Sequence, residues 1–256
     1  MEFLATLFNL AIYQPLYNGL IALYNFIPDL GIAIILLTLL IRIMLISLSK
    51  KSIESQKKMQ EIQPAIKRLQ EKYKNDRAKQ SQAIMQLYKE KKINPASGCL
   101  PLIIQLVILI ALYRVFMAGI SFNGDGHLLY SFVKNPGHIN HLAFGFIDIT
   151  KSNLWLALLA AGLQFWQTKM LMTKNEKVQT AKKQLEEKKD SEEPDFSTIM
   201  QKQMLYLGPF LTFIFGAKFS AGLPIYWITT TLFMIVQQYW IISKEKTALK
   251  AENKSS

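Results

Sequence analysis

The chain has 256 residues, is 50% hydrophobic, and carries a formal net charge of +12 and one Cys. This composition excludes a disulfide within the chain and is typical of a small polytopic membrane protein, not of a soluble domain. Residues 1–28 contain no Lys or Arg, so we expect no cleavable signal peptide, which would begin with a basic region.

Residues 1–28 are apolar, but polar side chains interrupt them and they end in Pro28-Asp29. The pattern predicts an amphipathic helix that lies in the outer interface of a membrane. A spanning or re-entrant segment is the alternative.

The next run, residues 29–49, is apolar and long enough to cross a bilayer, yet it contains Arg42. An arginine at mid-span costs about 2.5 to 3.5 kcal/mol on insertion scales, so an ionisable residue there indicates a function. The other apolar runs contain no Asp or Glu, and we therefore expect Arg42 to stay unpaired in a wet pocket, available to a group from outside the protein. Snorkelling is the structural alternative, because Arg42 lies only about 10 Å by helical rise before Ser49.

Residues 50–94 predict a helical hairpin in the cytoplasm. Apolar residues recur at spacings of three and four in two stretches, which begin at Met59 and Ile84, and this indicates two helices that pack together. Asn75-Asp76 offers the turn and cap between them, and Pro64 should kink the first helix. The basic surface suits electrostatic contact with anionic lipids, ribosomal RNA or an acidic client; a solvated spacer is the alternative.

Four more apolar runs follow, and the loops assigned to the cytoplasm are the basic ones, as expected when Lys and Arg are retained inside. We predict an all-α integral membrane protein whose five transmembrane helices form a bundle, with the N-terminus outside and the C-terminus in the cytoplasm. The further segments are spans over 96–118, 154–172, 203–218 and 221–242, an extracytoplasmic loop over 119–153, a cytoplasmic loop over 173–202 and a basic cytoplasmic tail over 243–256.

Polar side chains recur on one face of several predicted spans, and on the fifth span they align at helical spacing, together with Thr230. If these faces converge, they form a hydrophilic groove around Arg42 that water enters. Each amide or hydroxyl by itself could instead make an ordinary interhelical hydrogen bond, worth about 0.6 kcal/mol. The candidate groove residues are Thr38, Arg42, Gln105, Gln164, Gln167, Trp227, Thr231, Met234 and Gln238.

Several kinds of chemistry are not indicated. The predicted spans hold no carboxylate or histidine inside the membrane for a proton relay, and the chain has no Gly-rich phosphate loop and no H-E-x-x-H metal motif. The three histidines of the loop 119–153 lack a fixed spacing, so they are a weak signal for zinc. We expect no cofactor, no metal and no catalytic residue, and hence no enzyme.

Short motifs stand in a fixed order along most of the chain. They are Gln14-Pro-Leu-Tyr-Asn18, Arg42, Lys58-Met-Gln-Glu-Ile-Gln-Pro64, Leu69-Gln-Glu-Lys-Tyr73, Asn94-Pro95, Gly98-Cys-Leu-Pro101, Ala111-Leu-Tyr-Arg114, Pro224-Ile-Tyr-Trp227 and Gln237-Gln238. Together they resemble the YidC family of membrane protein insertases, which includes mitochondrial Oxa and chloroplast Albino relatives.

The resemblance implies the short five-span form of that family, without a large periplasmic domain and with a groove open to the cytoplasm and to lipid but closed outside. It implies that Arg42 receives the client, and that Trp227 and either Gln164 or Gln167 line the groove. The implied clients are nascent membrane proteins with acidic N-terminal tails, inserted into a bacterial plasma membrane. The Sec translocon, the ribosome and anionic lipids are further expected partners, and DNA is not. We expect no N-terminal lipoprotein signal and no extensive ribosome docking by the short tail.

Two other functions fit the same predicted fold. A small channel or transporter whose anionic substrate binds Arg42 would show steady solute flux, whereas an insertase should be leak-tight. A structural assembly factor for other membrane complexes would tolerate a neutral replacement of Arg42.

Overall fold

The computed structural model describes residues 2–94, 100–120, 128–183 and 196–255, most of which are helical. The elements are α1 (Glu2–Phe8), the π-helical turn η1 (Asn9–Tyr13), α2 (Gln14–Phe26), α3 (Leu30–Met44), α4 (Ile46–Glu61), α5 (Gln63–Lys72), α6 (Arg77–Glu90), α7 (Leu100–Ile120), β1 (Leu142–Ala143), β2 (Ile147–Asp148), α8 (Leu154–Lys183), α9 (Phe196–Lys218) and α10 (Gly222–Ser255). Over the described residues, none of these helices combines the length and the hydropathy required of a membrane span.

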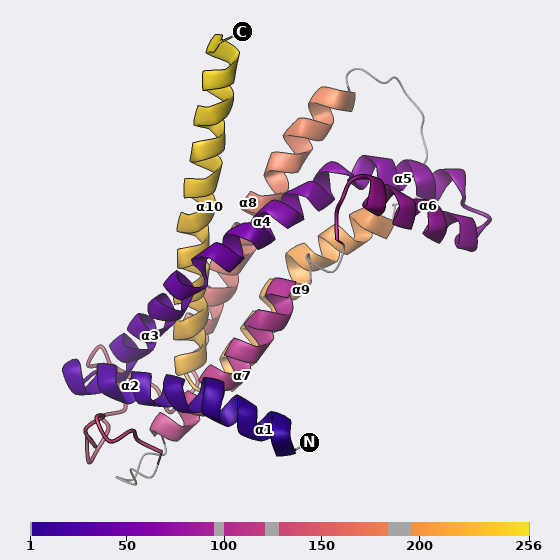
Figure 1. Ribbon diagram of the computed structural model, residues 1–256. Helices are drawn as coiled ribbons and strands as arrows, with labels where there is room; N and C mark the ends of the chain where they lie inside the picture. The colour runs from indigo at the N-terminus through magenta and orange to yellow at the C-terminus, as the bar shows by residue number, and fades with distance from the viewer. Residues whose placement is uncertain (1, 95–99, 121–127, 184–195, 256) are drawn as a thin grey trace.

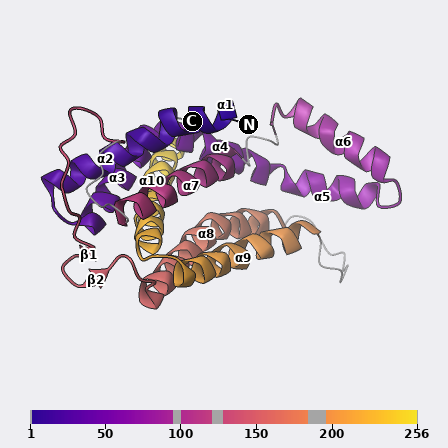
Figure 2. The same cartoon turned by 90° about the horizontal axis from the view of Figure 1, so that it is seen from below.

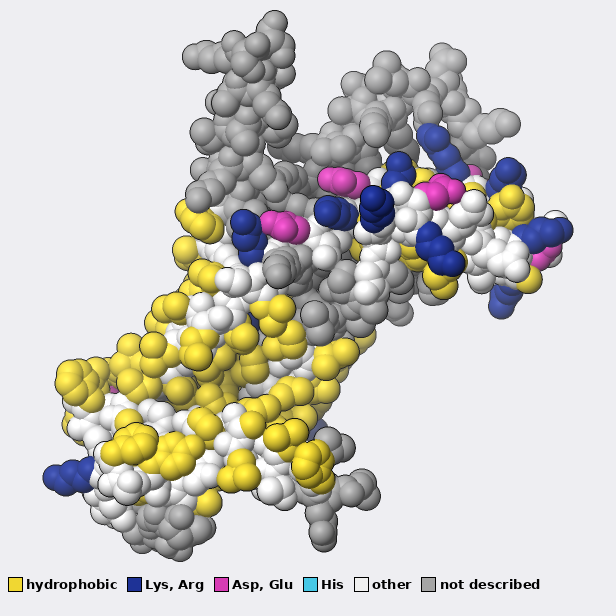
Figure 3. All heavy atoms as spheres, in the orientation of Figure 1, with side chains coloured by type: hydrophobic (Ala, Val, Ile, Leu, Met, Phe, Trp, Pro, Cys, Tyr) yellow, Lys and Arg dark blue, Asp and Glu magenta, His cyan; other side chains and the backbone are white. Residues whose placement is uncertain are grey.

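The N-terminal helix, which consists of α1, η1 and α2, lies across the ends of the longer helices (Figure 1). At the other end α5 and α6 project away from them. α8 and α9 lie side by side, and α10 lies between this pair and α3 (Figure 2). α2 packs against α3 and α7. Hydrophobic side chains cover the part of the molecule around α2, α3 and α7, whereas charged side chains gather over α4, α5 and α6 (Figure 3).

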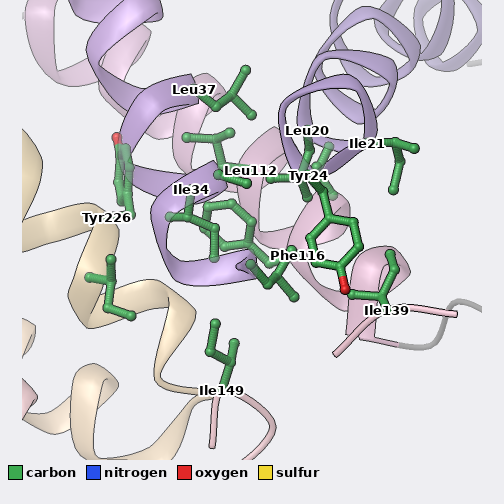
Figure 4. Close-up of a cluster of buried hydrophobic side chains, with 14 of the residues drawn as sticks. Leu20, Ile21, Tyr24, Ile34, Leu37, Leu112, Phe116, Ile139, Ile149 and Tyr226 are labelled. Carbon is green, nitrogen blue, oxygen red and sulfur yellow. The ribbon is translucent and has the colours of Figure 1, made fainter. Parts of the chain in front are cut away.

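The apolar core lies where α2 crosses α3 and α7 (Figure 4). Leu20 and Ile21 of α2 and Ile34 of α3 are fully enclosed there. Phe116 of α7 and Tyr226 of α10 complete the cluster, each with about 1% of its surface exposed. The buried residues of α2 and α3 recur every three or four positions, so one face of each helix enters the core.

Polar side chains of α2 hold residues 128–153, which belong to the loop between α7 and α8, against the helices. Nδ2 of Asn18 donates to the carbonyl oxygen of Leu128 at 2.9 Å, and Oδ1 of Asn18 accepts from the backbone N–H of Tyr130 at 2.6 Å. The hydroxyl of Tyr24 accepts from the backbone N–H of Asn140 at 2.7 Å. Asn18 is buried, so its amide is satisfied by the loop backbone in place of water.

Asp29 joins α3 to the hairpin formed by β1 and β2. Its Oδ1 accepts from the backbone N–H of Ile32 at 3.0 Å and caps α3, while its Oδ2 accepts from the backbone N–H of Phe144 at 2.6 Å. Gly31 lies so close to β1 that an added Cβ would come within 2.5 Å of the Cβ of Ala143. The hairpin can therefore reach its position only because residue 31 has no side chain.

Small residues allow α8 and α9 to pack closely. A Cβ on Gly216 of α9 would lie 3.0 Å from the Cβ of Ala157 on α8, and a Cβ on Gly208 would lie 3.3 Å from Nε2 of Gln164. Such residues let helix backbones approach each other, as is common between helices in membranes.

The N-terminal region and the first predicted span differ in detail from the sequence prediction. The predicted helix over 1–28 is present, but it contains a π-helical turn that the pattern does not indicate. The helix predicted over 29–49 is interrupted at Leu45, and α4 begins at the next residue.

The region of the predicted hairpin contains α5 and α6, and Oδ1 of Asp76 caps α6 by accepting from the backbone N–H of Lys79 at 3.0 Å. The helix is interrupted at Ile62, two residues before Pro64, and Pro64 lies in the first turn of α5. Proline is well suited to a first turn, where its missing N–H needs no partner.

The predicted loop over 119–153 contains a two-stranded sheet, and α10 continues through the predicted tail as far as Ser255. Parts of three predicted segments, residues 95–99, 121–127 and 184–195, lie outside the described residues.

Replacing Gly31 with Ala should lower the melting temperature of the detergent-solubilised protein, because the new methyl group must displace β1. Overpacking of this kind costs about 1 to 3 kcal/mol. Gly162→Ala is the control, since a Cβ there meets no atom within 4 Å and Ala favours a helix over Gly. Equal melting temperatures for Gly31→Ala and the unmodified protein would contradict the close approach.

The loop also contains a carboxyl group with a depressed pKa. The hydroxyl of Thr150 donates to Oδ1 of Asp148 at 2.6 Å, and Nζ of Lys151 lies 2.9 Å from Oδ2; these contacts lower the pKa of Asp148 to about 2. Since this value is below the ordinary 3.8, the stabilisation is present above that pH and is lost as the pH falls toward about 2.

Thr150→Val should raise the pKa of Asp148 toward 3.8, as followed by carboxyl carbon NMR during an acid titration. Lys151→Gln should also raise it, because the Lys151 ammonium group donates a hydrogen bond to the carboxylate and attracts its charge. A pKa that does not change in Thr150→Val would show that the hydroxyl does not stabilise the carboxylate.

Candidate functional site

Arg42 lies in the last turn of α3, and 7% of its surface is exposed. The sequence predicts a helix that continues to Ser49, but α3 ends at Met44. The break places Arg42 in the last turn of α3, and α4 begins only two residues after α3 ends.

Two other helices supply hydrogen-bond acceptors for Arg42. Its Nη2 donates to Oε1 of Gln105 on α7 and, at 3.4 Å, to the hydroxyl oxygen of Thr230 on α10. Nε2 of Gln105 in turn donates to the hydroxyl of Tyr226 on α10. These four residues, which we call the Arg42 cluster, join α3, α7 and α10 through side chains.

The partners of Arg42 in this cluster are neutral. The sequence predicts an arginine without a partner; the structure instead surrounds it with an amide and a hydroxyl, and no ion pair among the described side chains includes it. Hydrogen bonds to a charged group contribute about 1.5 to 3 kcal/mol each. The effective cost of burying an ion is several kcal/mol, so two such bonds are of the same order as that cost. The guanidinium is thus held by neutral dipoles, and its charge is not neutralised by a carboxylate among the described side chains.

The two candidate glutamines of α8 face different neighbours. Nε2 of Gln167, which is 7% exposed, lies 3.9 Å from Sδ of Met234 and donates toward α10. Oε1 of Gln164 accepts from the hydroxyl of Thr212 on α9. Gln167 is thus the one on the side of α10, where the Arg42 cluster has two of its members.

The remaining predicted residues are close-packed. Thr38 is 1% exposed, and its hydroxyl donates to the carbonyl oxygen of Ile34 at 2.7 Å, within its own helix. Thr231 and Gln238 of α10 are buried, and Trp227 packs against the apolar core. Oε1 of Gln238 is buried and has no hydrogen-bond partner among the described residues. Of the predicted set, the described structure joins only Gln105 to Arg42 by a hydrogen bond.

The sequence prediction does not include Tyr226 or Thr212. Tyr226 could have been found from its spacing, because it lies four residues before Thr230 and so on the same helix face. Thr212 carries no such signal, since no other polar residue marks a face of α9 near it. Its role depends on the approach of α8, which spacing within one helix does not predict.

Replacing Tyr226 with Phe should leave Nε2 of Gln105 without its acceptor and lower the melting temperature of the solubilised protein. An unsatisfied buried donor costs about 1 to 3 kcal/mol. Tyr239→Phe is the matched control, because Tyr239 is on the same helix and 56% exposed, so its loss of a hydroxyl should have little effect. Equal effects of the two changes would argue against the Gln105 to Tyr226 hydrogen bond.

Comparison with known proteins gives a match that includes this site. Residues 22–248 match the family described as 60Kd inner membrane protein. This stretch contains all four residues of the Arg42 cluster.

Curated relatives named membrane protein insertase YidC match nearly the whole chain. The relative from Syntrophus aciditrophicus (strain SB) is 37% identical over 231 residues, which cover 89% of this chain and 36% of the relative. Those from Lawsonia intracellularis (strain PHE/MN1-00) and Oleidesulfovibrio alaskensis are 34% and 32% identical over 91% and 90% of this chain and 39% and 38% of their own lengths. The chain thus spans about two fifths of the length of the curated relatives it matches.

A solved structure, described as an active YidC insertase crystal structure with the first transmembrane domain resolved, has a similar fold. The TM-score is 0.56 at 24% identity, and the alignment covers 89% of this chain and 46% of that one. From the family match over residues 22–248 and relatives up to 37% identical, the chain belongs to the family of 60Kd inner membrane proteins.

Proposed function

We propose that this protein is a membrane protein insertase, which carries short polar N-terminal tails across a bilayer and releases the adjoining hydrophobic segments sideways into lipid. The observation that carries the proposal is the buried guanidinium of Arg42, whose hydrogen-bond partners in the described structure are neutral. Relatives named as insertases support it. An insertase makes and breaks no covalent bond, so the proposal assigns no catalytic residue.

The proposed client supplies the negative charge that the Arg42 cluster lacks. A carboxylate about 4 Å from Arg42, at an effective dielectric constant of about 20, would gain about 4 kcal/mol. The desolvation cost of the carboxylate is of similar size, so the net attraction stays weak enough for release. Burial of the client's apolar segment in lipid, at about 25 cal/mol per Å² of apolar surface, then drives the segment out of the site.

We propose that α3, α7, α8, α9 and α10 are the membrane-crossing helices, with the N-terminus outside and the hairpin of α5 and α6 in the cytoplasm. The separation of charged from hydrophobic side chains in Figure 3 supports this orientation. The matching family is described as an inner membrane protein and the relatives are named membrane protein insertases, which supports an inner membrane for this chain.

The proposed groove contains the Arg42 cluster and the predicted residues that face it from α8 and α10. Gln167 and Gln238 are the polar groups on that side, and the partnerless Oε1 of Gln238 could accept a hydrogen bond from a client's backbone N–H. The Sec translocon and the ribosome are further proposed partners, and α5 and α6 present the basic surface that would meet the ribosome or anionic lipids.

Replacing Arg42 with Ala should reduce insertion of a single-span client with an acidic N-terminal tail by about tenfold or more, because one charge-assisted interaction is lost. Arg42→Lys should retain most of the activity. The measurement is protease protection of the client tail in proteoliposomes that contain each variant at equal density.

A client whose tail acids are replaced by their amides is the matched control, and its insertion should depend much less on Arg42. Equal insertion of both clients by all three proteins would mean that Arg42 is structural. Rapid efflux of an anionic dye from the same vesicles would instead favour an anion channel or transporter.

A further inference from the structure

Arg114 lies on the exposed apolar face of α7. Four exposed hydrophobic residues lie along this helix at spacings of three, four and seven: Ile103 (54%), Leu106 (55%), Ile110 (47%) and Met117 (38%). Arg114 falls on the same face, four residues after Ile110 and three before Met117, and it is also exposed. A single guanidinium is therefore set into a surface that is otherwise apolar.

Two aromatic rings of the N-terminal helix frame this guanidinium. The Cζ atom of Arg114 lies 5.8 Å from the ring centroid of Phe8 and 5.5 Å from that of Tyr13. In a regular α-helix, residues five apart point in different directions. The π-helical turn η1 fills the interval between Phe8 and Tyr13, and its i to i+5 hydrogen bond, from the N–H of Gln14 to the carbonyl of Asn9, brings both rings to the same side.

The rings stabilise the charge of Arg114 but cannot satisfy its hydrogen-bonding capacity. The faces of aromatic rings attract a cation, yet the five N–H donors of a guanidinium lie in its plane and need oxygen acceptors. Among the described side chains, no ion pair includes Arg114. Phosphate oxygens match the planar fork of an arginine, because two parallel hydrogen bonds can form, and every phospholipid headgroup carries a phosphate.

The depth of Arg114 fits a lipid phosphate. It lies six residues before the end of α7 at Ile120, or about 9 Å by helical rise, and beside the helix that crosses the end of the bundle. An amphipathic helix in a membrane interface lies at the boundary between headgroups and acyl chains. This placement rests on the orientation given in the proposed function.

We propose that Arg114, Phe8 and Tyr13 form a binding site for the phosphate of an anionic phospholipid in the leaflet that contacts the N-terminal helix. The lipid chains then cover the exposed apolar face of α7, and the phosphate pairs with Arg114 between the two rings. This site is separate from the Arg42 cluster and from the basic hairpin.

The test is native mass spectrometry of the full chain in detergent, titrated with phosphatidylglycerol. Arg114→Gln should weaken retention of one phosphatidylglycerol molecule about tenfold, because one charge-assisted bidentate contact is lost. Lys218→Gln is the matched control: it removes an exposed cation from the end of α9, which has no such aromatic frame, and should leave retention unchanged. Phe8→Leu with Tyr13→Leu should weaken retention while leaving the charge in place.

Separate arms identify the ligand. Inorganic phosphate at millimolar concentration should not displace the lipid, and phosphatidylcholine should be retained less than phosphatidylglycerol. Displacement by free phosphate, or equal retention of the two lipids, would overturn the assignment to an anionic phospholipid.

A melting-temperature series distinguishes a lipid site from a purely structural clamp. Phosphatidylglycerol should raise the melting temperature of the unmodified protein but not that of Arg114→Gln. Arg114→Gln could instead lower the melting temperature without lipid and retain phosphatidylglycerol normally. In that case the contact of Arg114 with Phe8 and Tyr13 only fixes the N-terminal helix to α7, and the proposal fails. Lipid retention is read without any client, so this failure is separate from failure of the insertase function.

Discussion

A guanidinium buried without a carboxylate needs oriented neutral dipoles around it, and this requirement ties three helices of the protein together. Arg42 is on α3, Gln105 on α7, and Thr230 and Tyr226 on α10. Tyr226 also belongs to the apolar core, so its ring and its hydroxyl serve two environments. The position of the charge and the packing of the core are therefore coupled through one side chain.

The core and the loop close one end of the bundle. Leu30, Ile34 and Leu37 of α3 enter the apolar core, and Arg42 follows only after the last of them along the same helix. Asn18 and Asp29 hold the loop over that end through its backbone N–H groups. A polar cluster backed by an apolar plug is the arrangement required of a groove that is open on one side only, as the proposed function needs.

Much of the helical arrangement could be predicted from the sequence, because long apolar runs and basic loops carry a strong signal. Arg42 and Gln105 stand out as polar residues in such runs, and the structure joins them. Spacing within one helix shows which residues share a face but does not show which helix that face will meet. For that reason the two glutamines of α8 could not be separated from sequence, although Gln164 contacts Thr212 and Gln167 faces Met234.

The break at Leu45 and the π-helical turn were also beyond prediction. No Pro or Gly lies beside Leu45, so the local sequence gives no signal for that break, and Pro15, two residues after η1, indicates an irregular helix without specifying a π-helical turn. Both features lie beside a cation: Arg42 is in the last turn of α3 before the break, and η1 brings two rings to Arg114. Tertiary contacts determine such details, and they are absent from any local pattern.

The close packing of α8 on α9 restricts where the bundle can part. The backbones of α8 and α9 are in close contact where Gly216 meets Ala157. α10 packs against both α8 and α3. Over the described residues α7 packs chiefly against α2 and η1, and it has no comparable interface with α9. If clients leave sideways, as proposed, a path between α7 and α9 would separate none of the larger helix interfaces in the described part of the chain.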